Sequence, residues 1–211
     1  MICLPVQRVA LLVAAVLLAA CASAPPTVFY TLLAAPSKAA VSTAKPDFVI
    51  ELMPVTVPSQ VDVPQLVIRR GPGELALVES RQWAAPLHRE LRTALSEQLS
   101  GTLGVADVYR LSASEGVPVL RIKVNVSRFE AWPAQQTVLN ATWTVSQLPT
   151  ETAEARTLTC GSQINQVVGA GYDALVAGYQ QAVQRLAAEI AAGVRNLRKS
   201  GANDCAGSVA G

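Results

Sequence analysis

Thiols and the single imidazole are the side chains of this sequence with the widest chemical repertoire. The 211-residue chain has four cysteines and one histidine, His88. A thiol can be acylated, oxidised to a disulfide or used as a metal ligand, and an imidazole can transfer protons or bind a metal. The sequence contains no C-x-x-C, no H-E-x-x-H, no G-x-S-x-G and no glycine loop of the phosphate-binding kind. We therefore expect no metal centre and no bound cofactor apart from a covalent lipid, for which the next observations argue.

The surroundings of Cys21 indicate such a lipid attachment. Arg8 precedes the apolar run 9–20, which would span about 18 Å as a helix, less than the roughly 30 Å hydrocarbon core of a bilayer. This length, the leading charge and the small residues that follow are typical of a secretory signal peptide. Leu18-Ala19-Ala20-Cys21 also matches the bacterial lipobox, in which a peptidase cuts before a cysteine that carries diacylglycerol. The competing interpretation is an ordinary A-x-A cleavage site at Ala20-Cys21-Ala22.

We predict that residues 1–20 are the signal peptide and that residues 21–27 are a lipidated tether. Cys21 would carry diacylglycerol and an N-acyl chain such as palmitate. At about 0.8 kcal/mol per buried methylene, these chains would anchor the protein permanently. Ala22 and Ser23 are not the aspartate that is associated with retention at the inner membrane, so the expected location is the outer membrane, on its periplasmic face.

The remaining cysteines are candidates for a disulfide. Cys3 leaves with the predicted signal peptide and Cys21 is modified by lipid, so Cys160 and Cys205 remain in an oxidising compartment. A bond between them would close a loop of about 45 residues and contribute about 3 to 4 kcal/mol in the chain-entropy description. The alternative is two separate buried thiols.

Two amphipathic helices are the clearest predicted elements. After Pro86, leucines recur every four residues from Leu87 to Leu99, which predicts a helix ending near Gly101 or Gly104. His88 falls on its polar side, so we interpret this histidine as a solvated surface residue. A longer apolar stripe over residues 172–197 predicts a second helix of about 27 residues.

The strands are predicted from alternation and turn signals. In residues 119–128 and 138–146, apolar and polar side chains alternate, which predicts antiparallel strands covered on one face only. Pro54 predicts an edge position or a break in the strand at 48–57. Further strands are expected at 28–33, 65–70, 74–79 and 156–164, with a hairpin turn at Gly71-Pro72-Gly73.

The predicted fold class is therefore α+β. It has a mostly antiparallel (mixed) sheet of about six to eight strands, with two main amphipathic helices packed on one face. Residues 28–205 are expected to form one domain, followed by a frayed tail at 206–211.

Charge and motif content argue against several functions. The chain has 17 basic residues, of which Arg8 leaves with the signal, and 15 acidic residues. This balance predicts no nucleic-acid partner, and the missing phosphate loop predicts no nucleotide. Single scattered carboxylates and one histidine predict no enzyme activity.

A proline-rich stretch with one tryptophan is the candidate docking surface. Prolines bound rigid segments, and aromatic and arginine side chains concentrate at interface centres. The structural alternative is an edge strand, a hairpin and a helix start, with a tryptophan packed as a staple. The candidate residues are Pro54, Pro58, Pro64, Gln65, Arg69, Trp83 and Pro86.

Five motifs in order resemble the PqiC-like family of auxiliary lipoproteins of ABC-type and MCE-type intermembrane transport systems. They are the lipobox, the aromatic-Tyr-Thr-Leu segment 29–32, P-V-x-V-P at 54–58, P-Q at 64–65 leading to Arg69, and R-x-W-A-x-P-L at 81–87. The sequence departs from the family pattern at Val61-Asp62-Val63 and at Ala85.

The resemblance implies a non-enzymatic lipoprotein of the outer membrane that docks on an MCE-domain tunnel protein. A membrane permease subunit would be a further partner, and a homo-oligomer is possible in such an assembly. Two other functions stay open: a structural or assembly lipoprotein that stabilises another envelope complex, and an envelope hydrolase with an unrecognised site.

Overall fold

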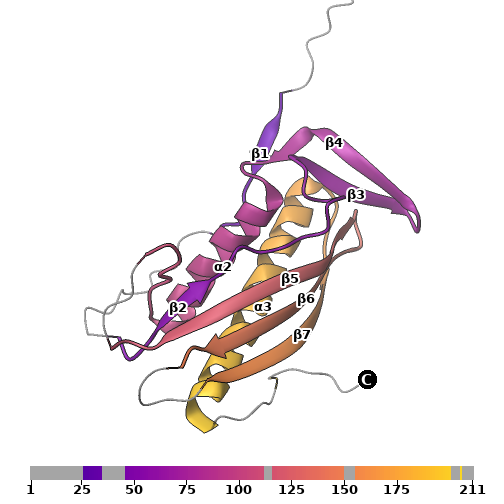
Figure 1. Ribbon diagram of the computed structural model, residues 1–211. Coiled ribbons are helices and arrows are strands. Elements are labelled where there is room, and N and C mark those ends of the chain that lie inside the picture. Colours follow the sequence, from indigo (N-terminus) through magenta and orange to yellow (C-terminus); the bar gives the residue numbers. More distant parts are fainter. Residues whose placement is uncertain (1–25, 35–45, 112–115, 150–154, 201–204, 206–211) are drawn as a thin grey trace, which may run out of the picture.

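The strands of this protein form two separate mixed sheets (Figure 1). The computed structural model describes residues 26–34, 46–111, 116–149, 155–200 and 205. The predicted signal peptide, Cys21 and most of the tether, and the tail 206–211 lie outside these residues. In chain order the elements are β1 (Val28–Tyr30), β2 (Val49–Leu52), β3 (Gln65–Gly71), β4 (Glu74–Trp83), α2 (Leu87–Leu103), β5 (Val119–Trp132), β6 (Gln136–Gln147), β7 (Arg156–Val167) and α3 (Tyr172–Ser200).

The larger sheet has the strand order β2-β5-β6-β7. β5, β6 and β7 form an antiparallel meander, in which Val124 pairs with Trp143 and Trp143 with Cys160. The period-two pattern turns one set of side chains to the core and the other set to solvent, as predicted. The solvent side, which we call the open face, includes Lys123, Asn125, Thr142, Thr157, Thr159, Gln163 and Asn165.

β2 is a parallel edge strand that Pro54 interrupts. Val49 to Leu52 pair with Val119 to Ile122 of β5. The strand ends before Pro54, and pairing resumes only at an isolated bridge between Thr56 and Asn125. Because proline cannot donate a ladder hydrogen bond, the expected break in an edge strand is confirmed.

The smaller sheet has the order β1-β4-β3. β3 and β4 form the predicted hairpin, in which Gly71 pairs with Glu74. β4 extends to Trp83, beyond the predicted end at Glu79, because its last residues pair in parallel with β1, from Val28 opposite Arg81 to Tyr30 opposite Trp83.

The two helices cover the core side of the larger sheet. α3 contacts β6 and β7, while α2 lies beside α3 and against β2. α2 ends at Gly104, whose φ of 70° is a left-handed conformation that glycine adopts without a Cβ penalty. α3 approaches the sheet closely at Gly193, where an added Cβ would lie 2.6 Å from Cη2 of Trp143.

A buried carboxylate joins α2 to β2. Asp107 accepts hydrogen bonds from the Arg92 guanidinium at 2.8 Å, from the Ser96 hydroxyl at 2.6 Å and from the Leu52 amide at 3.1 Å. A buried carboxylate needs several such donors to offset the loss of water. This cluster fixes the end of β2, where the proline-rich segment begins.

The predicted α+β class is confirmed, with seven strands and two helices among the described residues. The strands divide into two sheets because the chain leaves the larger sheet after its last contacts with β5 at Thr56 and starts the hairpin at Gln65. Each sheet also has one parallel pair, β2 with β5 and β1 with β4.

Candidate docking surface

The segment 53–64, which we call the inter-sheet segment, connects the two sheets and is held along its length. The Thr56 amide donates to the Val124 carbonyl at 3.2 Å, and the Thr56 carbonyl accepts from the Val126 amide at 2.9 Å. The Pro64 carbonyl then accepts from the Trp83 amide at 2.8 Å. Pro54 and Pro64 are exposed and Pro58 is half-buried. The segment is therefore a fixed surface feature with little backbone freedom left to lose on binding.

The inter-sheet segment also caps α2. Pro86 occupies the N-cap position and has no side chain that accepts a hydrogen bond. Asp62 supplies the acceptor instead, because its Oδ1 accepts from the His88 amide at 3.2 Å and lies 3.0 Å from Nδ1 of the His88 ring. A carboxylate at a helix N-terminus is also favoured by the helix dipole. His88 is thus half-exposed and hydrogen-bonded, rather than the free solvated residue that we expected.

Gln65 and Arg69 lie at opposite ends of β3 and are both engaged in internal contacts. The side-chain amide of Gln65 donates through Nε2 to Glu79 Oε2 at 3.0 Å. Arg69 Nη2 donates to Glu130 Oε1 at 2.7 Å, and its guanidinium lies 6.0 Å from the ring centre of Trp132. Both side chains are partly buried and border the surface, and both have partners within the chain, although the buried Nε of Arg69 has none.

Trp83 lies in the core, which corrects its place in the predicted docking surface. The side chain is 4% exposed and packs edge-on against Phe129 and Tyr179, with ring centres 6.3 and 6.1 Å away. Phe129 and Tyr179 are stacked at 3.9 Å. Because β4 continues to Trp83, the indole points between the hairpin, β5 and α3. It supports the surface from below and presents no area to a partner.

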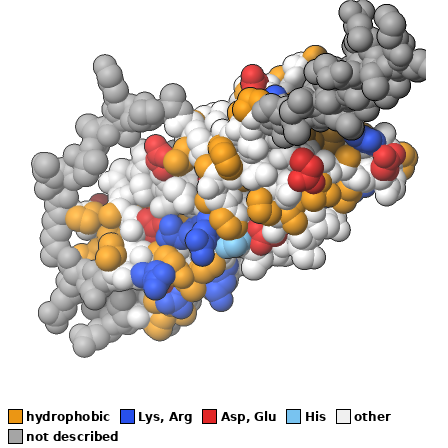
Figure 2. Space-filling view, turned by 90° about the horizontal axis from the view of Figure 1, so that it is seen from above, with side chains coloured by type: hydrophobic (Ala, Val, Ile, Leu, Met, Phe, Trp, Pro, Cys, Tyr) orange, Lys and Arg blue, Asp and Glu red, His pale blue; other side chains and the backbone are white. Residues whose placement is uncertain are grey.

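The structure therefore brings together part of the predicted set. Pro64, Gln65 and the backbone of Trp83 adjoin at the start of β3, and Pro86 is linked to the inter-sheet segment through Asp62 and His88. Arg69 lies at the far end of β3. On the face that Figure 2 presents, hydrophobic side chains are scattered among charged and polar ones.

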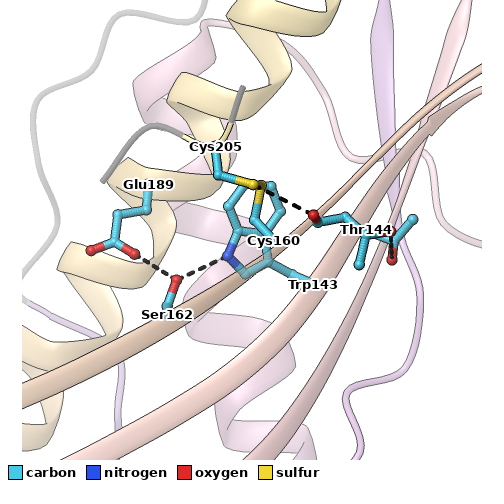
Figure 3. Close-up of a disulfide and its surroundings, with 7 residues drawn as sticks. Trp143, Thr144, Cys160, Ser162, Glu189 and Cys205 are labelled. Atoms are coloured by element: carbon cyan, nitrogen blue, oxygen red, sulfur yellow. Dashed lines mark hydrogen bonds between the residues drawn. A yellow bond between two sulfur atoms is a disulfide. The ribbon is translucent and has the colours of Figure 1, made fainter. Parts of the chain in front are cut away.

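Cys160 and Cys205 are joined by a disulfide, with their Cα atoms 5.7 Å apart (Figure 3). Cys160 is buried on the helix side of β7, next to Trp143. The Trp143 indole donates to Ser162 Oγ at 2.9 Å, and the Ser162 hydroxyl donates to Glu189 of α3. The bond ties Cys205, which follows α3, to the middle of β7.

Reduction of this disulfide is expected to destabilise the mature domain by about 2 to 4 kcal/mol, because the unfolded chain regains the freedom that the cross-link removes. Thermal unfolding with and without reductant measures the effect. In Cys205→Ala, which already lacks the bond, the reductant should change nothing. An unchanged melting temperature of the wild-type protein under reductant would show that the bond does not stabilise the fold.

Glu130 is the most strongly paired carboxylate of this region. Its pKa is lowered, chiefly by the hydrogen bond from Arg128 and also by Arg69, against the opposing effect of burial. Arg128 Nη2 lies 2.8 Å from Glu130 Oε2. The nearby Tyr179 is fully buried, and burial with the charge of Glu130 raises the pKa of its phenol well above the usual value.

Glu130→Gln is expected to destabilise the protein by about 1.5 to 3 kcal/mol at neutral pH, since hydrogen bonds to a charged group are lost. A lowered folded-state pKa gives stability that is present above the unfolded pKa and is lost as pH falls through the folded value. The difference between variant and wild type should therefore shrink below about pH 4.5. Urea unfolding across this range measures it, and a difference that is constant with pH would contradict the charge-based explanation.

A small cavity adjoins the docking surface. A cavity of about 10 Å³ lies among Val61, Val67, Trp83, Leu87, Phe129 and Tyr179. That is room for roughly one water molecule. Within the described ranges, no group of three or more His, Cys, Asp or Glu side chains is placed to hold a metal ion. Among the same residues, no helix is long and apolar enough to cross a bilayer.

Glu90 of α2 is a buried carboxylate, and the sequence pattern of the helix does not predict its burial. It is 6% exposed and accepts hydrogen bonds from the Thr31 hydroxyl at 2.8 Å and from the Leu32 amide at 2.9 Å. In sequence it is one of the polar residues between leucines. Only the placement of the chain after β1 on α2 explains its burial.

Together, the fold and this surface define a class: a two-sheet α+β domain with a rigid proline-bounded segment where its sheets meet. Residues 30–191 match the family of ABC-type transport auxiliary lipoprotein components. The chain belongs to this family, which confirms the resemblance drawn from its motifs.

Solved structures show the same fold. A crystal structure of an uncharacterized protein superposes with a TM-score of 0.60 at 19% identity, covering 81% of this chain and 99% of that one. A Xanthomonas campestris protein of the DUF330 family gives a TM-score of 0.53 at 16% identity, covering 82% of this chain and 96% of that one. A comparison with curated protein sequences finds no significant match.

Proposed function

We propose that this protein is a docking subunit of an ABC-type transport system, anchored through lipid on Cys21 to the periplasmic face of the outer membrane. The observation that carries the proposal is the family match over residues 30–191, directly downstream of a lipobox. In this proposal the partner is an MCE-domain tunnel protein that works with a membrane permease subunit. The protein itself catalyses no reaction.

The inter-sheet segment is the proposed contact with that partner. Pro54 and Pro64 present exposed side chains on a backbone that is already fixed by β5 and β4. Docking on such a segment costs little conformational entropy, so modest contacts suffice for affinity. The open face of the larger sheet remains available for a second copy of the chain within the same assembly.

The cavity next to Trp83 is too small to be a lipid site. A lipid acyl chain needs an apolar groove far larger than the roughly one-water space next to Trp83. In our proposal the lipid passes through the partner, while this subunit holds the end of the partner at the membrane.

Affinity purification of the lipidated protein from its native membranes, followed by partner identification, tests the proposal. The wild type should recover an MCE-domain protein. Gln60→Glu combined with Pro64→Glu places two charges on exposed positions of the inter-sheet segment. Desolvating these charges at an interface should lower recovery by about tenfold or more, corresponding to about 1.4 kcal/mol.

The control is Arg156→Glu, an exposed charge reversal at the start of β7, on the sheet edge opposite β2. It should recover the partner as well as the wild type does. Recovery of no component of a transport system by the wild type would refute the proposed function. Equal recovery by the double variant and the control would remove the inter-sheet segment from the interface.

A further inference from the structure

β1 presents two consecutive exposed hydrophobic side chains close to the predicted anchor. Phe29 is 63% exposed and Val28 is 38% exposed. Successive strand residues point to opposite sides, so both sides of this short edge strand carry an apolar group. A largely exposed phenyl ring forgoes most of the free energy that its burial would contribute, which favours a partner for it.

The chain that follows Phe29 is held in place by hydrogen bonds to α3 and β4. The residue that follows it, Tyr30, donates through its hydroxyl to Asp173 of α3 at 2.6 Å, and its carbonyl accepts from the Ala84 amide at 2.8 Å. Two turns further along α3, the side chain of Gln180 donates through Nε2 to the backbone carbonyls of Thr31 and Leu33, at 3.1 and 3.2 Å. α3 and β4 thus fix the direction in which Phe29 points.

The neighbours of Phe29 are the types found where protein meets lipid headgroups. Arg81 lies opposite Val28 in the register, and its guanidinium is 5.6 Å from the ring centre of Tyr172. Tyr30 is the next residue in the strand. Because successive strand residues point to opposite sides, Tyr30 and Arg81 lie on the side of β1 opposite Phe29. One side of the strand therefore carries an apolar ring, and the other carries side chains with apolar bodies and polar ends, the types that suit the boundary between acyl chains and headgroups.

The length of the tether limits how far this end of the protein can lie from a membrane. Five peptide steps separate Cys21 from Pro26, so their Cα atoms are at most about 18 Å apart. The opposite end is remote: α3 begins beside β1 and runs for 29 residues, or about 43 Å (Figure 1). Only the β1 end therefore stays near the bilayer in every conformation of the tether.

We propose that Phe29 is a second membrane contact, inserted into the phospholipid bilayer beside the acyl anchor. This inference rests on the proposed lipidation of Cys21. The acyl chains hold the protein on the membrane, and Phe29 orients it, with Arg81 and the two tyrosines at headgroup level. α3 then points away from the membrane, and the inter-sheet segment is held at a fixed height for its partner.

Photocrosslinking at position 29 tests this contact while keeping an aromatic side chain. The lipidated full chain, with p-benzoylphenylalanine in place of Phe29, is reconstituted in vesicles of phosphatidylethanolamine and phosphatidylglycerol and irradiated. The matched control carries the same group at Leu111. This residue is 72% exposed and lies beyond the C-terminal end of α2, whereas β1 is next to the N-terminal end of that helix.

We expect phospholipid adducts, read by intact mass, to be about tenfold or more abundant at position 29 than at position 111. Equal adduct yields at the two positions, a covalent dimer through position 29, or no adduct would each overturn the proposal. In native membranes, a protein adduct at position 29 in place of the lipid adduct would assign Phe29 to a partner and overturn it as well.

Flotation of the vesicles separates this result from the anchoring proposal. If the protein does not float with the vesicles, Cys21 carries no anchor and the proposed function fails first. If it floats but position 29 yields no lipid adduct, only the Phe29 contact is wrong.

Discussion

Cys21→Ala is expected to release the protein from the membrane fraction while leaving the domain folded. The acyl chains supply the attachment, at about 0.8 kcal/mol for each buried methylene, and a single phenyl ring cannot replace them. The variant keeps Ala20 and Ala22, so an ordinary A-x-A site for cleavage of the signal is still present. Cell fractionation with detection of the mature protein measures the change.

Cys3→Ala is the matched control, because Cys3 lies within the predicted signal peptide. It should leave the wild-type distribution unchanged. If Cys21→Ala still partitions wholly with the membranes after its signal has been removed, the attachment does not depend on lipid at Cys21.

Trp83→Ala is expected to destabilise the domain by about 3 to 5 kcal/mol, the usual cost of removing a large buried aromatic side chain. Trp83 contacts the buried rings of Phe129 and Tyr179, so removal of the indole leaves a cavity in the core. Urea unfolding, monitored by far-ultraviolet circular dichroism, measures the loss.

Trp132→Ala is the comparison, because Trp132 is partly exposed and contacts Arg69 through its ring. Its cost should be about 1 kcal/mol, the scale of a cation–π contact. If instead Trp83→Ala keeps wild-type stability and only partner recovery falls, the indole acts at the interface and not in the core.

The sequence predicted the structure best where the side-chain pattern depends on a single helix or strand. Alternation in β5 and β6 predicted which side chains face the helices, because the period of a strand is two and one face is covered. The leucines from Leu87 to Leu99 predicted α2, and the late cysteines predicted a pair that the structure joins.

Features that depend on distant partners could not be predicted from local patterns. The pairing of β1 with β4 joins residues more than 50 positions apart, and this pairing extends β4 to Trp83 and buries the indole. Ser80-Arg81-Gln82 has no apolar alternation, so no local signal marks it as strand. The structural role of Glu90 likewise depends on Thr31 and Leu32, which directly follow β1.

The exposure of the candidate docking residues was predicted in part for the same reason. Prolines mark exposed backbone in any environment, so Pro54 and Pro64 were placed correctly at the surface. An aromatic side chain suits a core as well as an interface, and Trp83 belongs to the core. Phe29, in contrast, was interpreted as part of a strand and of a family motif, because the pattern of a three-residue strand does not predict which side chains are exposed.

The proposed function requires that this subunit acts from the membrane surface through a covalent lipid. Intact-mass and peptide mass spectrometry of the mature protein, purified from membranes, tests it most directly. We expect an N-terminus at residue 21 whose cysteine carries diacylglycerol and an amide-linked acyl chain. An unmodified thiol at that residue, or a mature chain that starts elsewhere, would contradict it.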